Sequence, residues 1–141
     1  MISPEVQIRK IDSYNLPEIE EAVAAYFSAI NSHKLSHSKR VLIKPNALGA
    51  YAPERAVTTH PVVLEAVIRY FLNKKKEIWI GDSPGGSLGF ETVWQSCGYS
   101  SLAEKYPVKM VNFSTAGFRE VTFGKRTYKV SEALFQCGIV I

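Results

Sequence analysis

Short apolar runs alternate along the chain with stretches in which apolar residues recur every three or four positions. Val41–Ile43 and Ile78–Ile80 are compact runs of β-branched and aromatic side chains, which is typical of buried strands. Val108–Asn112 and Gly138–Ile141 have the same character. Val6–Ile11 mostly alternates apolar with polar residues, as a half-buried strand does. We therefore predict a strand at each of these segments.

Helical spacing separates the predicted strands. Asn15 can cap a first helix that has Pro17 in its first turn. A second helix is predicted to have Pro61 in its first turn, with Thr59 as the better candidate for its N-cap. A third, short helix over Glu91–Cys97 is predicted to end at Gly98. The buried face of the first helix is predicted to contain Leu16, Ile19, Val23, Tyr26, Phe27 and Ile30.

This alternation of strands and helices predicts an α/β fold with a mainly parallel sheet and helices on both faces. Gly124-Lys125, between two alternating segments, has the Gly-X signature of a small β-hairpin. A length of 141 residues suits a single α/β domain over residues 1–141. Because the apolar Gly138–Ile141 has no polar loop after it, we expect a domain truncated at its C-terminus, the N-terminal part of a longer protein.

Composition narrows the class of protein. Hydrophobic residues make up 46% and charged residues 21%, as in ordinary globular domains, and no apolar run is long enough to span a bilayer. The first residues lack the features of a signal peptide, so we expect a soluble, cytoplasmic protein that does not bind membranes. The net charge of +4 favours anionic ligands, but the basic residues are spread out except for Lys74–Lys76, so nucleic acid is not the expected partner.

The two cysteines, Cys97 and Cys137, are far apart in sequence and belong to no CxxC motif. Two thiolates alone cannot complete an iron-sulfur cluster or an all-cysteine zinc site. We expect both to be free and buried, and the residues of this chain identify neither a metal site nor a specific cofactor.

Two of the predicted strands lead directly into polar residues. Lys44-Pro45-Asn46 follows the first, and Asp82-Ser83 follows the second, with Gly85 and Gly86 shortly after. The carboxyl edge of an open α/β sheet is where ligands bind, so these groups are candidates for a shared site. The glycines could let backbone N–H groups approach an anion, or they could serve only as a tight turn. Lys44 could bind a phosphate or carboxylate, or pair with Asp82.

Asp82 itself could ligate a metal, act as a base, or accept hydrogen bonds from the amides of its own loop. Thr58, Thr59 and His60, just before the second helix, could bind a second anion, although helix capping would also explain them. Arg55, in the long loop between Pro45 and Thr58, could close over an anionic ligand or be solvated.

These residues carry a family resemblance. Val41–Asn46, Pro53–Pro61 and Gly81–Gly86 form three ordered motifs that resemble the family called domain of unknown function 362. Its members are often described as iron-sulfur proteins because many carry a ferredoxin-like cysteine cluster, which this sequence lacks. The resemblance implies that relatives continue past the position of Ile141, with further lysine, threonine and histidine motifs.

Our leading hypothesis is a small anionic ligand bound at the carboxyl edge of the sheet, with or without a metal ion. Whether the site is catalytic stays open. The alternative is a redox or iron-sulfur-associated module that meets a redox partner and whose cluster ligands lie outside this chain. The candidate ligand-binding residues are Lys44, Asn46, Arg55, Thr58, Thr59, His60, Asp82, Ser83, Gly85 and Gly86.

Overall fold

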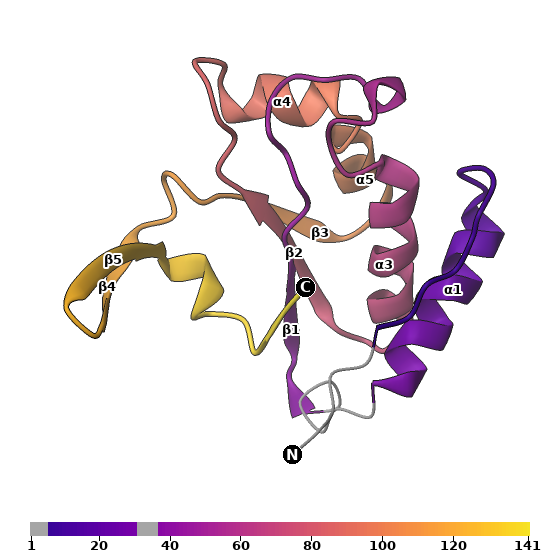
Figure 1. Ribbon diagram of the computed structural model, residues 1–141, viewed down its shortest axis with the longest axis horizontal. Helices are drawn as coiled ribbons and strands as arrows, with labels where there is room; N and C mark the ends of the chain where they lie inside the picture. Colours follow the sequence, from indigo (N-terminus) through magenta and orange to yellow (C-terminus); the bar gives the residue numbers. More distant parts are fainter. Residues whose placement is uncertain (1–5, 31–36) are drawn as a thin grey trace.

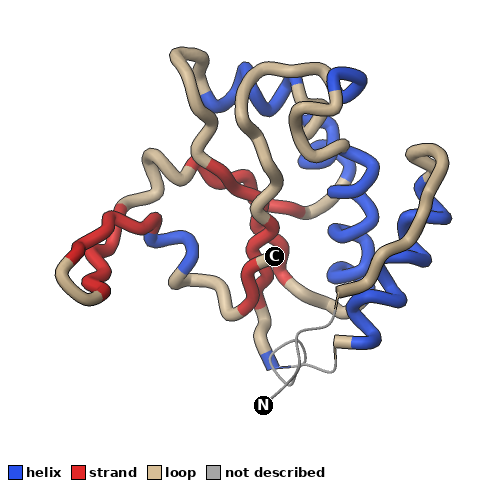
Figure 2. Tube along the Cα trace, viewed as in Figure 1, coloured by secondary structure: helices blue, strands red, loops and turns tan. Residues whose placement is uncertain are grey.

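The computed structural model describes residues 6–30 and 37–141 (Figures 1 and 2). The α-helices are α1 (Leu16–Ala29), α3 (Pro61–Asn73), α4 (Phe90–Ser96) and α5 (Ser100–Lys105), and the 3-10 turns are η1 (Pro53–Arg55) and η2 (Glu132–Leu134). The strands are β1 (Arg40–Ile43), β2 (Glu77–Asp82), β3 (Val108–Asn112), β4 (Phe118–Phe123), β5 (Arg126–Ser131) and β6 (Ile139–Val140).

Four parallel strands form the main sheet, in the order β3-β2-β1-β6. Arg40 pairs with Glu77 and Ile43 with Ile80 between β1 and β2, while Val41 pairs with Ile139 between β1 and β6. The chain therefore moves from β1 to β2 and β3 on one side, then returns to place β6 on the other side of β1. The predicted α/β fold with a mainly parallel sheet is confirmed.

A separate antiparallel hairpin, β4–β5, projects from the body on the side opposite α1 (Figure 1). Its turn lies at Gly124-Lys125, where the sequence predicted it, and Gly124 has a positive φ of 60°.

The two faces of the sheet are covered differently. Alternate strand residues, such as Val41 and Ile78, pack into one core with side chains from α1, α3, α4 and α5. Leu42 and Trp79, on the opposite face, form a smaller cluster with Ala133 of η2 and its neighbours. We expected helices on both faces. Instead, the α-helices gather on one face, because the connection from β3 to β6 is built from the hairpin and a short 3-10 turn.

The first helix forms where it was predicted, but its predicted buried face is only partly buried: Ile19 and Phe27 are buried, whereas Tyr26 and Ile30 are exposed. The Asn15 side chain accepts a hydrogen bond from the backbone N–H of Glu18, and a proline lies in the first turn. Near its other end, Phe27 packs against Tyr70 and Phe71 of α3, with ring centroids 5.0 and 4.9 Å apart. Aromatic packing thus attaches α1 to α3 rather than directly to the sheet.

The strand predicted at Val6–Ile11 is wrong for this structure. The segment has no strand partner, and Val6 and Ile8 are 81% and 93% exposed. Alternation predicts which side chains share a face of a strand but does not supply a neighbouring strand, and β6 ends the sheet without pairing to this segment.

Within residues 6–30 and 37–141, none of the helices is both long enough and apolar enough to cross a membrane.

Gly81 provides a test of the packing at the centre of the sheet. A Cβ added there would lie 2.4 Å from the Phe113 ring and 2.7 Å from the Val111 carbonyl oxygen. Gly81→Ala should therefore lower the free energy of unfolding by about 1–3 kcal/mol, measured by denaturant titration. Gly89→Ala is the control, because its Cβ would meet only a side-chain oxygen at 3.7 Å. Equal stability losses in the two variants would contradict this packing.

Candidate functional site

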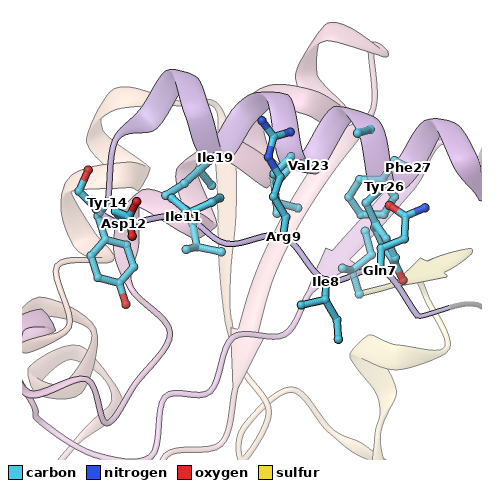
Figure 3. A pocket seen from close by; sticks show the side chains of 16 residues that line it. Gln7, Ile8, Arg9, Ile11, Asp12, Tyr14, Ile19, Val23, Tyr26 and Phe27 are labelled. Carbon is cyan, nitrogen blue, oxygen red and sulfur yellow. The ribbon is translucent and has the colours of Figure 1, made fainter.

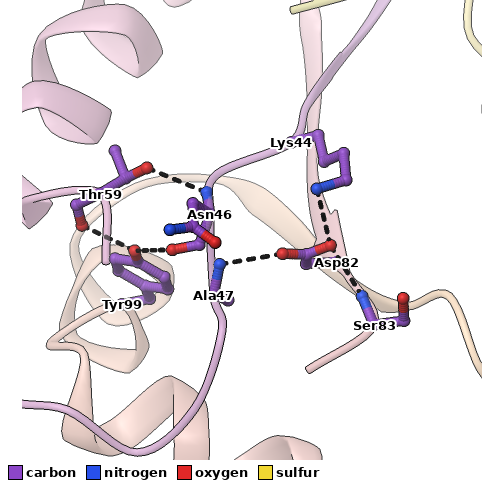
Figure 4. Close-up of polar contacts among 7 residues, drawn as sticks. All are labelled: Lys44, Asn46, Ala47, Thr59, Asp82, Ser83 and Tyr99. Atoms are coloured by element: carbon purple, nitrogen blue, oxygen red, sulfur yellow. Dashed lines mark hydrogen bonds and ion pairs between the residues drawn. The ribbon is translucent and has the colours of Figure 1, made fainter. Parts of the chain in front are cut away.

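Lys44 and Asp82 meet at the carboxyl ends of β1 and β2 (Figure 4). The Lys44 ammonium lies 2.9 Å from Asp82 Oδ1. The two side chains differ in burial, since that of Asp82 is 8% exposed and that of Lys44 is 47% exposed. Parallel pairing of the two strands brings their ends together, so the polar residues that follow each strand share one edge.

The Asp82 carboxylate is held on both oxygens. Oδ2 accepts a hydrogen bond from the Ala47 backbone N–H at 2.9 Å, and Oδ1 accepts one from the Ser83 N–H at the same distance. A buried carboxylate needs this compensation, because burying an uncompensated charge is costly. Asp82 therefore ties the segment after β1 to the loop after β2.

Asn46 and Thr59 form a second polar group on the other side of the segment from Lys44 to Ala47 (Figure 4). The Thr59 hydroxyl accepts a hydrogen bond from the Asn46 N–H at 2.9 Å, and the Asn46 side-chain amide donates to the Val57 carbonyl. The Tyr99 hydroxyl donates to the Thr59 carbonyl at 2.6 Å. These bonds close the long loop onto the start of α3.

Tyr99 is fully buried, and burial is the main cause that raises the pKa of its hydroxyl to about 12. Thr58 is also buried, and its hydroxyl makes no hydrogen bond of normal geometry with the described residues. It nevertheless lies close enough to the Tyr99 hydroxyl to oppose the rise in that pKa. The Tyr99 hydroxyl stays protonated and acts as a donor.

His60, rather than Thr59, is the N-cap of α3. Its Nδ1 accepts a hydrogen bond from the Val62 N–H, and its ring stacks on Tyr14 with centroids 3.5 Å apart. The prediction of Thr59 as the cap is wrong because its hydroxyl already accepts from Asn46. Capping accounts for His60 here, and burial lowers the pKa of its imidazole.

The other predicted site residues, at the rim of the site, are Ser83, Gly85, Gly86 and Arg55. The Ser83 side chain is exposed, and the Gly85 N–H donates to the Leu48 carbonyl, which joins the glycine loop to the segment after β1. Gly86 has a φ of +87°, which a glycine adopts without strain. Arg55 is exposed on η1. Its backbone N–H donates to the Ala52 carbonyl, but its guanidinium makes no hydrogen bond or ion pair with the described residues. Arg55 is thus not brought to Lys44 by any contact.

The two cysteines are free and buried, as expected, and they belong to different clusters on the two faces of the sheet. Burial is the main cause that raises the pKa of the Cys137 thiol. In the described parts of the chain, no group of three or more His, Cys, Asp or Glu side chains could hold a metal ion.

Residues 41–141 match the model of a protein family described as a domain of unknown function (DUF362). The chain belongs to this family. The match spans more than half of the chain and confirms the resemblance carried by the three motifs. No curated protein and no solved structure matches the sequence.

Two groups at the site were not predicted from the sequence: the Tyr99 hydroxyl and the Ala47 backbone N–H. Tyr99 reaches the site from the turn between α4 and α5, and Ala47 contributes only its backbone N–H. The sequence holds no signal for either of them, because Tyr99 lies far from the three motifs and any residue except proline supplies an N–H.

Asp82 should be important for stability whether or not it meets a ligand. In the DUF362 chain, Asp82→Ala leaves the Ala47 N–H without its buried acceptor and removes the partner of Lys44. We expect the free energy of unfolding to fall by about 2–3 kcal/mol, and by less for Asp82→Asn, which keeps one acceptor oxygen. Asp12→Ala, which breaks an exposed ion pair with Lys10, is the control and should change it by less than about 1 kcal/mol. Denaturant titration of the three variants measures these differences, and an Asp82→Ala variant as stable as the control would refute the role.

His60 should make stability depend on pH. Its Nδ1 accepts a hydrogen bond only when unprotonated, and its pKa is lowered in the folded protein, so the unfolded chain binds the proton more tightly. The stabilisation is therefore present above the ordinary pKa of 6.5 and is lost as the pH falls.

The test compares the native chain with His60→Asn, whose side chain can cap at any pH. Between about pH 7.5 and about pH 5.5, the native chain should lose up to about 1 kcal/mol more stability than this variant. Equal losses in the two proteins would show that His60 does not cap α3 through an unprotonated imidazole.

Proposed function

We propose that this domain binds a small anionic ligand at the carboxyl edge of its sheet, with the Lys44 ammonium as the main contact. The observation that carries the proposal is the position of Lys44 at the point where the strand order reverses. From β1, the chain continues on one side to β2 and β3, and β6 is added on the other side. In open α/β sheets, such a switch point opens a crevice at the carboxyl ends of the strands, and ligands bind there.

Lys44 lies directly at this switch point. It is the first residue after β1, and its backbone N–H donates to the carbonyl of Ile141, the first residue after β6, at 2.8 Å. The backbone of Lys44 is thus fixed on both sides, by β1 before it and by Ile141 beside it. A side chain that starts from a fixed backbone presents its charge at a defined place.

The Lys44 ammonium retains capacity for a ligand. An ammonium has three donors, and among the described residues only Asp82 forms an ion pair or hydrogen bond with it. Nearly half of the side chain is exposed, so two donors can turn towards a carboxylate or phosphate without breaking the pair with Asp82. The pair holds the ammonium in place, while the Ala47 and Ser83 amides share the negative charge of Asp82.

These contacts favour an anion over a metal ion as the ligand. Both oxygens of Asp82 already accept hydrogen bonds from backbone amides, and one of them also meets Lys44. A metal ion at Asp82 would have to displace the ammonium and would then lie beside a positive charge. An anion gains from the same ammonium, and the exposed Ser83 hydroxyl supplies a further donor at the rim.

The test uses thermal unfolding with three anions at constant ionic strength: inorganic phosphate, a nucleoside monophosphate and malonate. At least one should raise the Tm of the native chain in a saturable way, since a ligand that binds only the folded state stabilises it. Lys44→Met should abolish the rise, and Lys44→Arg should keep part of it. Lys125→Met, which removes an exposed charge from the hairpin turn, is the matched control and should keep the full rise.

Each rise is measured against the Tm of the same variant without the anion, so that a change in intrinsic stability does not enter the comparison. Lys44→Met with the same saturable rise as the native chain would show that the anion binds elsewhere. No rise with any of the three anions in the native chain would argue against the ligand class.

A further inference from the structure

An apolar groove runs beneath α1, between the segment that precedes this helix and the end of β6 (Figure 3). Its volume is about 940 Å³, which is the size of a large ligand pocket or of several side chains. Its walls include Ile19, Val23 and Phe27 of α1, Val67 of α3, and Ile141 just after β6. The inward face of α1 therefore extends beyond the last strand of the sheet and leaves apolar side chains without a strand beneath them.

The last strand of the sheet has an open edge beside this groove. β6 pairs with β1 on one side, and none of the described strands pairs with its other side. An open edge presents backbone N–H and C=O groups that an added strand would satisfy.

A segment with the pattern of a strand lies at the rim of the same groove. Gln7 and Ile8 lie near Tyr26 and Phe27, at the end of α1, and Ile11 lies near Ile19, at its beginning (Figure 3). The segment thus runs antiparallel to α1 and in the same direction as β1 (Figure 1). It has the direction of a parallel strand, yet Ile8 points away from the helix and is 93% exposed.

The connection rule for parallel strands indicates where this segment belongs. The crossovers from β1 to β2 and from β2 to β3 place their helices on one face and move away from β6. A strand beside β6 would be followed by α1, on the same face of the sheet, and then by β1. This connection would have the same handedness as the two crossovers above, and nearly all connections between parallel strands have that handedness. The free edge of β6 also lies beside the groove, which Ile141 lines.

We propose that residues 6–11 dock as a fifth parallel strand on the free edge of β6, giving the order β3-β2-β1-β6 followed by this segment. Alternation then places Val6 and Ile8 on one face, beneath α1, where they fill the groove. The structure shows the undocked form. In this form residues 6–11, α1 and β1 are already aligned, but residues 6–11 lie away from the sheet.

The ion pair between this segment and α1 offers little resistance to docking. Arg9 pairs with Glu21 of α1 at 3.0 Å, but both side chains are largely exposed, and such pairs contribute little to stability. Tyr14, which stacks on His60, is separated from the docking strand by Asp12 and Ser13 and can stay in place as the hinge. Docking would bring Asp12 to the carboxyl edge of the sheet, the same edge as Lys44, because the strands are parallel.

Substitution of Ile8 separates the two forms. At 93% exposure, Ile8 can be replaced by Asp in the undocked form without loss of stability. In the docked form it is buried, so Ile8→Asp should lower the Tm by about 5 °C or more. Phe123→Asp is the control, because Phe123 is an apolar side chain of similar exposure, 83%, on the hairpin and should change the Tm little. An unchanged Tm in both variants would overturn the proposal.

Amide hydrogen exchange of the full chain gives a second readout that does not depend on a variant. Docking predicts that amides of residues 7–11 exchange at least about tenfold more slowly than amides of an unpaired chain, at every protein concentration. Exchange at the rate of an unpaired chain would overturn the proposal. Protection that grows with concentration, together with a dimer in gel filtration, would also overturn it, because the strand would then dock on a second copy.

Discussion

The fold around the candidate site depends on one buried carboxylate. Asp82 lies at the end of β2, accepts hydrogen bonds from the amides of Ala47 and Ser83, and pairs with Lys44. The segment after β1 and the loop after β2 thus share one negative group, and the Gly85–Leu48 backbone bond joins them again further along. Without a buried acceptor at this place, the backbone N–H groups of Ala47 and Ser83 would lose the partner that they share.

The same arrangement explains how a structural ion pair can also be a binding site. A salt bridge in which both partners are buried has no capacity left for a ligand, whereas this pair is buried at the carboxylate and half exposed at the ammonium. The carboxylate accepts hydrogen bonds within the protein. The ammonium faces the solvent at the point where the strand order reverses. This difference in burial is the physical basis for assigning the anion contact to Lys44 rather than to Asp82.

The sheet itself is covered unevenly. Its helical face is packed with aromatic and aliphatic side chains from β1, β2 and the four α-helices, and the opposite face carries a smaller cluster around Trp79. At the β6 edge, α1 is held by its contacts with α3 and extends past the last strand, which leaves an open edge and an apolar groove side by side. Both features concern the same missing neighbour, a strand beside β6.

The sequence by itself determined the elements whose signal is local. Apolar runs located β1, β2, β3 and β6, the Gly-X turn located the hairpin, and Asn15 located the start of α1, because these depend on neighbouring residues only. Parallel strands also made the meeting of Lys44 and Asp82 predictable. Only the tertiary structure decided that His60 caps α3, that Tyr99 bonds to Thr59, and that residues 6–11 lie apart from β6. Each of these depends on which distant group pairs with a given donor, acceptor or strand edge. The order of residues along the chain does not specify that pairing.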